Sequence, residues 1–153
     1  MLSPHPRSTA RIGRHPIHPM LVPFPIVFFV SAFVTDLLFV NGHGSVWASA
    51  SYWLLIAGLI GGALAAVAGL VDFLGDARIR SLGAAKAHFA GNVTAVVLEA
   101  INAYLRSGDP AVVVAGSGII LSGVVVLILL VTVWLGGELV FCHGVGVDRV
   151  PEA

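Results

Sequence analysis

The sequence predicts an all-α integral membrane protein, folded as a four-helix bundle with antiparallel, up-down-up-down helices. Hydrophobic residues make up 58% of the 153-residue chain and charged residues only 10%, whereas a typical soluble domain has about 25% charged residues. The apolar residues form long runs, and about 20 apolar residues are enough for a helix to cross a bilayer. The connections between these runs are short, which favours antiparallel neighbours.

The first predicted helix covers residues 20–41 and follows a basic segment, residues 1–14. Its apolar run contains Asp36 as the only charge. A cleaved signal peptide is the alternative interpretation, but its apolar region is about 7–15 residues long and ends at small residues. This run is longer and ends in the sequence FVNG. We therefore expect a permanent membrane helix here.

The second predicted helix covers residues 46–74. Gly61, Ala65 and Gly69 recur every four residues within it and form one stripe of small side chains. Such stripes allow helices to approach each other closely in lipid, where packing drives association. We expect this stripe to serve helix packing and assign it no chemistry.

The third predicted helix, residues 84–106, is the most polar of the four. His88, Asn92, Glu99 and Asn102 lie on one side of it, because each residue turns an α-helix by about 100°. Polar groups are costly in a membrane, so this side is expected to face the bundle interior. For the two asparagines, we favour hydrogen bonds that fix the helix register over a functional role.

The fourth predicted helix covers residues 111–141, after the helix-opening pair Asp109-Pro110. The transmembrane domain then extends over residues 15–147, and residues 148–153 form a short cytoplasmic tail. Along the first helix, Asp36 lies about 24 Å from the start, level with Arg106 at the end of the third helix. This predicts an Asp36–Arg106 ion pair that clamps the bundle.

The basic residues predict the orientation. Lys and Arg are enriched on the cytoplasmic side of membrane proteins. Of the eight in this chain, all except Arg106 lie near the termini or between the second and third helices. Both termini are therefore expected to be cytoplasmic (N-in and C-in). The formal net charge of zero argues against a nucleic-acid partner, which usually needs a basic face, and the lipid bilayer is the expected partner.

Ionisable side chains converge at the cytoplasmic end of the predicted bundle. They are His15, His18, Asp72, His88, Glu138 and His143. Imidazoles bind haem iron and many metal ions, so two histidines from different helices could hold a haem. Histidine and carboxylate ligands also suit Zn, Fe or Mn. The alternative metal site consists of His18, His88, Asp72 and Glu138. A polar network without any ligand is the third interpretation, and His5 and His43 are expected to face solvent.

The segment HPIHPMLVPFPI, followed by an apolar run ending in DLL, resembles the DUF2231 family of bacterial membrane proteins of unknown function. The segments AGLVDF, RSLGAAKA before His88, and GGELV with HGVGV resemble that family as well. The resemblance covers about residues 14 to 147. Its matching positions are His15, His18, Asp72, His88 and Gly137. It implies a bacterial inner membrane, and the Rieske-type or cytochrome-like domains joined to some members imply redox work.

Together these observations favour a redox-associated protein that binds b-type haem through histidines at the cytoplasmic end. The candidate cofactor-binding residues are His15, His18, His88 and His143. His88 is the expected axial ligand on one side, with His18 or His143 on the other. Arg78, Arg80 and Lys86 are the expected partners of the haem propionates. A non-haem metal protein and a structural accessory subunit remain alternatives. Enzymatic activity, a redox partner protein, a quinone and a homo-oligomer are left open.

Overall fold

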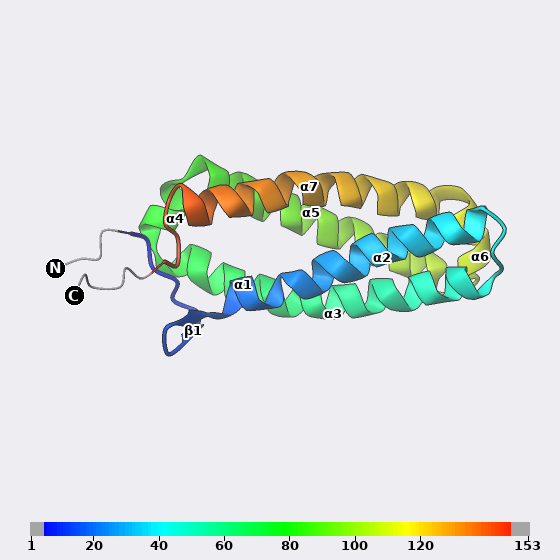
Figure 1. Cartoon of the computed structure of the whole chain (residues 1–153), viewed down its shortest axis with the longest axis horizontal. Coiled ribbons are helices and arrows are strands. Elements are labelled where there is room, and N and C mark those ends of the chain that lie inside the picture. The colour runs from blue at the N-terminus through cyan, green and yellow to red at the C-terminus, as the bar shows by residue number, and fades with distance from the viewer. Residues whose placement is uncertain (1–4, 148–153) are drawn as a thin grey trace.

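The structure is a computed structural model that describes residues 5–147. Four long helices dominate it and lie side by side along the long axis of the molecule (Figure 1). They are α2 (Pro23–Val40), α3 (Val46–Gly75), α5 (Gly83–Arg106) and α7 (Ile119–Phe141). Consecutive long helices run in opposite directions, so the part of the chain before α2 and the part after α7 lie at the same end of the molecule (Figure 1). The expected all-α membrane class is therefore confirmed.

Short elements connect the long ones. They are β1 (Arg11–Ile12), β2 (His15–Pro16), α1 (Ile17–Leu21), α4 (Ala77–Ser81), α6 (Pro110–Val113) and η1 (Val114–Gly118), where non-helical backbone at Gly116 kinks the chain. The two strands pair antiparallel around a turn in which Gly13 has a φ of 60°. Positive φ is easily adopted by glycine because it has no Cβ. We call residues 5–16 the N-terminal segment.

The first membrane helix begins earlier than residue 20. The rule that a residue before proline avoids the helical region predicts an extended segment from His15 to Pro19. Only His15 and Pro16 are extended, because Ile17 already starts α1. Pro19 is tolerated in α1 because the first turn of a helix does not use its amide hydrogens. The chain then passes through Val22 into α2.

Within residues 5–147, three helical stretches are long and apolar enough to cross a membrane: Ile17–Val40, Val46–Gly75 and Pro110–Phe141. Helix α5 is as long as the first of these but carries Lys86, Glu99 and Arg106. Glu99 and Arg106 are fully buried against the other helices. The polarity of α5 thus reflects the bundle interior that it faces.

The small residues of α3 do serve packing, as predicted. Gly58 lies against the ring of Phe29 on α2, and a Cβ on Gly61 would lie 3.4 Å from Pro25. The buried residues between the long helices are likewise mostly small or aliphatic, around Phe29, Leu55 and Val125. The glycines of α3 therefore allow the backbones of α2 and α3 to approach each other closely.

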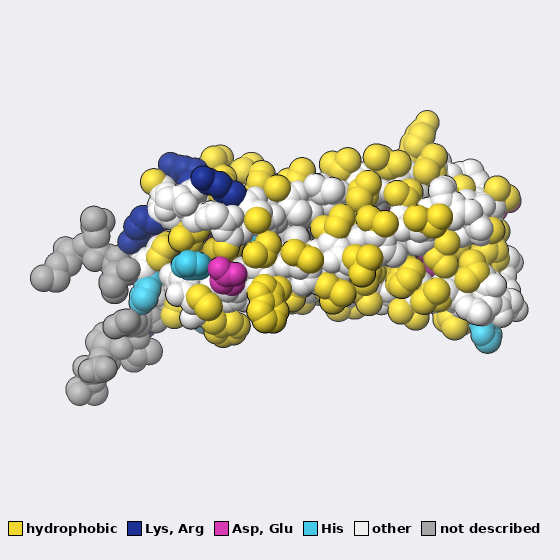
Figure 2. Space-filling model, turned by 90° about the horizontal axis from the view of Figure 1, so that it is seen from above, with side chains coloured by type: hydrophobic (Ala, Val, Ile, Leu, Met, Phe, Trp, Pro, Cys, Tyr) yellow, Lys and Arg dark blue, Asp and Glu magenta, His cyan; other side chains and the backbone are white. Residues whose placement is uncertain are grey.

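On the face seen in Figure 2, apolar side chains are spread along the length of the molecule, and Lys and Arg gather at one end. We call this the basic end; it holds the N-terminal segment and residues 76–82. The opposite end is formed by the loops 41–45 and 107–109. Exposed large side chains such as Trp53, Leu127 and Trp134 lie between the two ends. A surface of this kind suits hydrocarbon rather than water.

Candidate functional site

His18 lies in α1, and its ring packs against α3. Its Nδ1 is 2.8 Å from the carbonyl oxygen of Ala65. A carbonyl oxygen only accepts hydrogen bonds, so Nδ1 carries the hydrogen and donates. The ring fits because residue 69 is glycine: a Cβ there would lie only 2.9 Å from the imidazole.

His88 lies near the start of α5 and is held in the same manner by α7. Its Nδ1 donates to the carbonyl oxygen of Thr132 over 2.8 Å. A glycine again provides the room, because a Cβ on Gly136 would lie 3.1 Å from the ring. Both histidines are thus fixed by backbone groups of neighbouring helices.

The two imidazoles lie next to each other in a T-shaped arrangement towards the basic end of the bundle. Their ring centroids are 6.3 Å apart and their planes are nearly perpendicular, at 89°. Because Nδ1 carries the hydrogen in each neutral ring, Nε2 carries a lone pair. Neither Nε2 makes a hydrogen bond to another described residue. Metal-binding histidines are commonly oriented in this way, with one ring nitrogen tied to a carbonyl and the other free to coordinate.

Asp72, a candidate metal ligand, is engaged by the N-terminal segment. Its Oδ1 accepts hydrogen bonds from the backbone nitrogens of Thr9 and Ala10, at 2.6 and 2.7 Å. The Ser8 hydroxyl lies within 3.0 Å of both carboxylate oxygens. The carboxylate therefore fastens the N-terminal segment across the end of α3.

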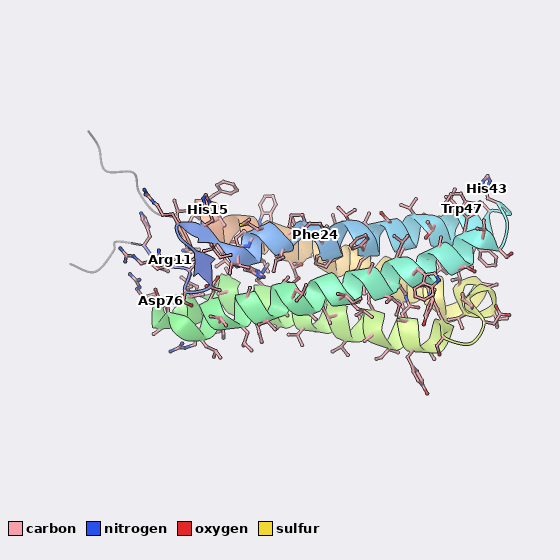
Figure 3. All side chains as sticks on the ribbon, turned by 90° about the horizontal axis from the view of Figure 1, so that it is seen from below. Arg11, His15, Phe24, His43, Trp47 and Asp76 are labelled. Atoms are coloured by element: carbon pink, nitrogen blue, oxygen red, sulfur yellow. The ribbon has the colours of Figure 1, made fainter. Side chains whose placement is uncertain are left out.

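The other candidate ligands lie apart from the His18–His88 pair. His15 is exposed on β2, near Arg11 and Asp76 at the basic end (Figure 3). His143 Nε2 lies 3.6 Å from Glu138 Oε1, just beyond α7. Within residues 5–147 no three His, Cys, Asp or Glu side chains are grouped so that they could hold a metal ion together.

The histidines expected to face solvent differ from each other. His43 is exposed in the loop at the opposite end, close to Trp47 (Figure 3). His5, by contrast, is half-buried, because its ring lies against Gly144. The expectation is therefore confirmed for His43 and wrong for His5.

The basic residues near the pair are mostly engaged. Arg78 binds the carboxylate of Asp76 at 2.6 Å, and this guanidinium holds the pKa of Asp76 well below its usual range. Arg80 donates to the carbonyl oxygens of Phe73 and Leu74 at the end of α3. Lys86, in the first turns of α5, is exposed. Of the three expected propionate partners, Lys86 is the one without such a contact.

A second polar group lies towards the opposite end. The predicted Asp36–Arg106 pair is confirmed: Nη1 and Nη2 of Arg106 lie 2.8 Å from the two carboxylate oxygens of Asp36. Both side chains are completely buried. Arg106 also donates to the hydroxyls of Ser51 and Ser122. No sequence pattern singles out these two serines as its partners.

The apolar surface, the long helices and the buried polar groups define a multi-pass α-helical membrane protein. The model of the family described as "Predicted membrane protein (DUF2231)" matches residues 14–149. The chain therefore belongs to this family, as its opening segment indicated. No curated protein and no solved structure matches the chain.

Proposed function

We propose that all four long helices cross the bacterial cytoplasmic membrane, with both termini inside. The support is the distribution of charge among the described residues. Arg106 is neutralised by Asp36. The remaining Lys and Arg residues all lie at the basic end: Arg7, Arg11, Arg14, Arg78, Arg80 and Lys86. Positive charge on one side only is typical of the cytoplasmic side.

We infer that the His18–His88 pair is a ligand set for one b-type haem. The observation that carries this proposal is the pair itself: two rings fixed through Nδ1, each with an unengaged Nε2. The two rings come from different helices and their centroids are 6.3 Å apart. His18 and His88 would therefore be the residues that hold the haem iron.

The number of ligands favours haem over a bare metal ion. Zinc sites use three or four protein ligands, whereas haem iron needs one or two axial side chains because the macrocycle supplies the rest. The structure brings together two imidazoles whose Nε2 atoms make no hydrogen bond to another described residue, whereas Asp72 binds the N-terminal segment. A two-histidine set therefore suits haem, and haem supplies one-electron transfer when bound.

Other residues of the chain would orient the two histidines and bind the haem propionates. The carbonyls of Ala65 and Thr132 hold the ring orientation and the tautomer of the two histidines. The exposed ammonium of Lys86 is available to a propionate near the headgroups. An electron carrier also needs a partner, and we propose a redox protein or a quinone at the basic end.

An absorption spectrum of the protein purified in detergent from haem-supplied cells tests this proposal. We expect a Soret band and a reduced α-band, and loss of both in His18→Ala and in His88→Ala. His43→Ala is the matched control and should keep the spectrum, since this histidine lies in the loop of the opposite end.

The same preparation distinguishes the alternatives. If the protein shows no haem absorption but contains a stoichiometric transition metal that is lost in His88→Ala, the ligand is a bare metal ion and not haem. A protein with neither haem nor metal, in which His88→Ala only lowers stability, would mark the histidines as structural. Either result would overturn the haem proposal.

A further inference from the structure

The buried polar network near the opposite end contains one carboxyl group, that of Glu99, to which its neighbours offer no counter-charge. Arg106 uses all five of its N–H donors. Nη1 and Nη2 donate to Asp36 and to the hydroxyls of Ser51 and Ser122. Nε donates to Oδ1 of Asn102 over 2.9 Å. The guanidinium therefore has no donor left for another group.

Glu99 lies one and two helical turns before Asn102 and Arg106 on the same face of α5, and it is completely buried. Its Oε2 accepts a hydrogen bond from Nδ2 of Asn102 over 2.9 Å. The amide cannot turn around, because its Oδ1 is held by Arg106. Among the described residues, no donor reaches Oε1.

Charge balance decides the state of this carboxyl group. Asp36 on α2 and Arg106 on α5 are the charged groups of the network, and they compensate each other. The other helices, α3 and α7, contribute the hydroxyls of Ser51 and Ser122. An ionised Glu99 would therefore be an uncompensated negative charge, and such a charge is far more costly inside a membrane than a neutral acid.

We propose that Glu99 binds a proton and is the neutral, proton-carrying acid of this network. The carboxyl group holds its proton on Oε1, the oxygen that no donor reaches, while Oε2 accepts from Asn102. Asp36 cannot take this role, because its protonation would leave the buried positive charge of Arg106 without a counter-charge. Glu99 is thus the carboxyl at which a proton is stored inside the membrane without disturbing the ion pair.

The test compares the same chemical change, acid to amide, at the two buried carboxyl groups. Glu99→Gln replaces a neutral acid by a neutral amide, so its unfolding midpoint should stay close to that of the wild type. Asp36→Asn is the matched control and should unfold at a clearly lower temperature, because Arg106 then lacks its counter-charge. Equal losses in the two variants would overturn the proposal, and so would an Asp36→Asn protein as stable as the wild type.

Infrared spectroscopy gives a second, independent measurement on the folded wild type. We expect the carbonyl stretch of a protonated carboxylic acid near neutral pH, shifted when glutamate is supplied in isotope-labelled form and absent in Glu99→Gln. A wild-type spectrum without a glutamate-derived acid band would show that Glu99 is ionised, and would overturn the proposal even if every variant folds.

Discussion

At the level of single residues, Arg106 is a completely buried charge and therefore depends strongly on its neighbours. A buried charge is tolerated only when it is paired and its hydrogen bonds are satisfied. The bidentate contact with Asp36 meets the first condition, and the hydroxyls of Ser51 and Ser122 help to meet the second. Glycine at position 118 belongs to the same arrangement, because a Cβ there would lie 3.0 Å from Nη2 of Arg106.

Removing only one member of this pair should be more harmful than removing both. Arg106→Met leaves Asp36 buried without a counter-charge, and breaking a buried pair costs about 3–5 kcal/mol. The double variant Asp36→Leu with Arg106→Met should recover most of this loss, because apolar side chains can replace a buried pair. Unfolding in mixed detergent measures both. A double variant no more stable than Arg106→Met would contradict the pairing argument.

At the scale of elements, the N-terminal segment is held to α3 by side-chain contacts. Asp72 accepts from Ser8, Thr9 and Ala10, and the Thr9 hydroxyl donates to the carbonyl of Val71 over 2.9 Å. Gly75 leaves room for the Thr9 side chain. The segment also binds the C-terminal part of the described chain, since the nitrogen of Gly146 donates to Pro6.

Loss of the Asp72 carboxylate should therefore release this segment. Hydrogen bonds to a charged group contribute about 1.5–3 kcal/mol each, and Asp72→Ala removes several of them. We expect faster trypsin cleavage at Arg11 and Arg14 in the detergent-solubilised protein. Asp109→Ala serves as control, because Asp109 caps α6 at the opposite end through Ala111. Unchanged cleavage in Asp72→Ala would refute this role.

At the scale of the whole molecule, the two ends of the bundle differ in charge and in access. Polar loops close the opposite end, while the basic end holds the N-terminal segment and lies nearer to the His18–His88 pair. The proposed orientation exposes the basic end to the cytoplasm. The single cysteine, Cys142, is exposed just after α7 at this end.

Cys142 is thus a native probe of orientation. A membrane-impermeant maleimide should leave it unlabelled in intact spheroplasts and label it in inverted vesicles. With Cys142→Ser and His43→Cys combined, the pattern should reverse, because residue 43 lies in the loop of the opposite end. Labelling of the wild type from outside would show that the termini face outwards.

The membrane class, the approximate helix positions and the Asp36–Arg106 pair could be predicted from sequence patterns alone. These depend on quantities that are local along the chain. The length of an apolar run decides whether it spans a bilayer, and the rise of 1.5 Å per residue places Asp36 and Arg106 at a common depth. The resemblance of the opening segment likewise identified the family that the chain belongs to.

Which ionisable groups lie next to each other near the basic end depends on how the helices pack and could not be predicted from the sequence. His18 and His88 lie next to each other, and Gly69 and Gly136 leave space for their rings. Asp72 instead binds the N-terminal segment. The two imidazoles donate hydrogen bonds to backbone carbonyl oxygens. Every helical residue has such a carbonyl, so the type of residue does not reveal which one accepts. The partners depend on how each helix is rotated about its axis, and that rotation is set by packing between helices.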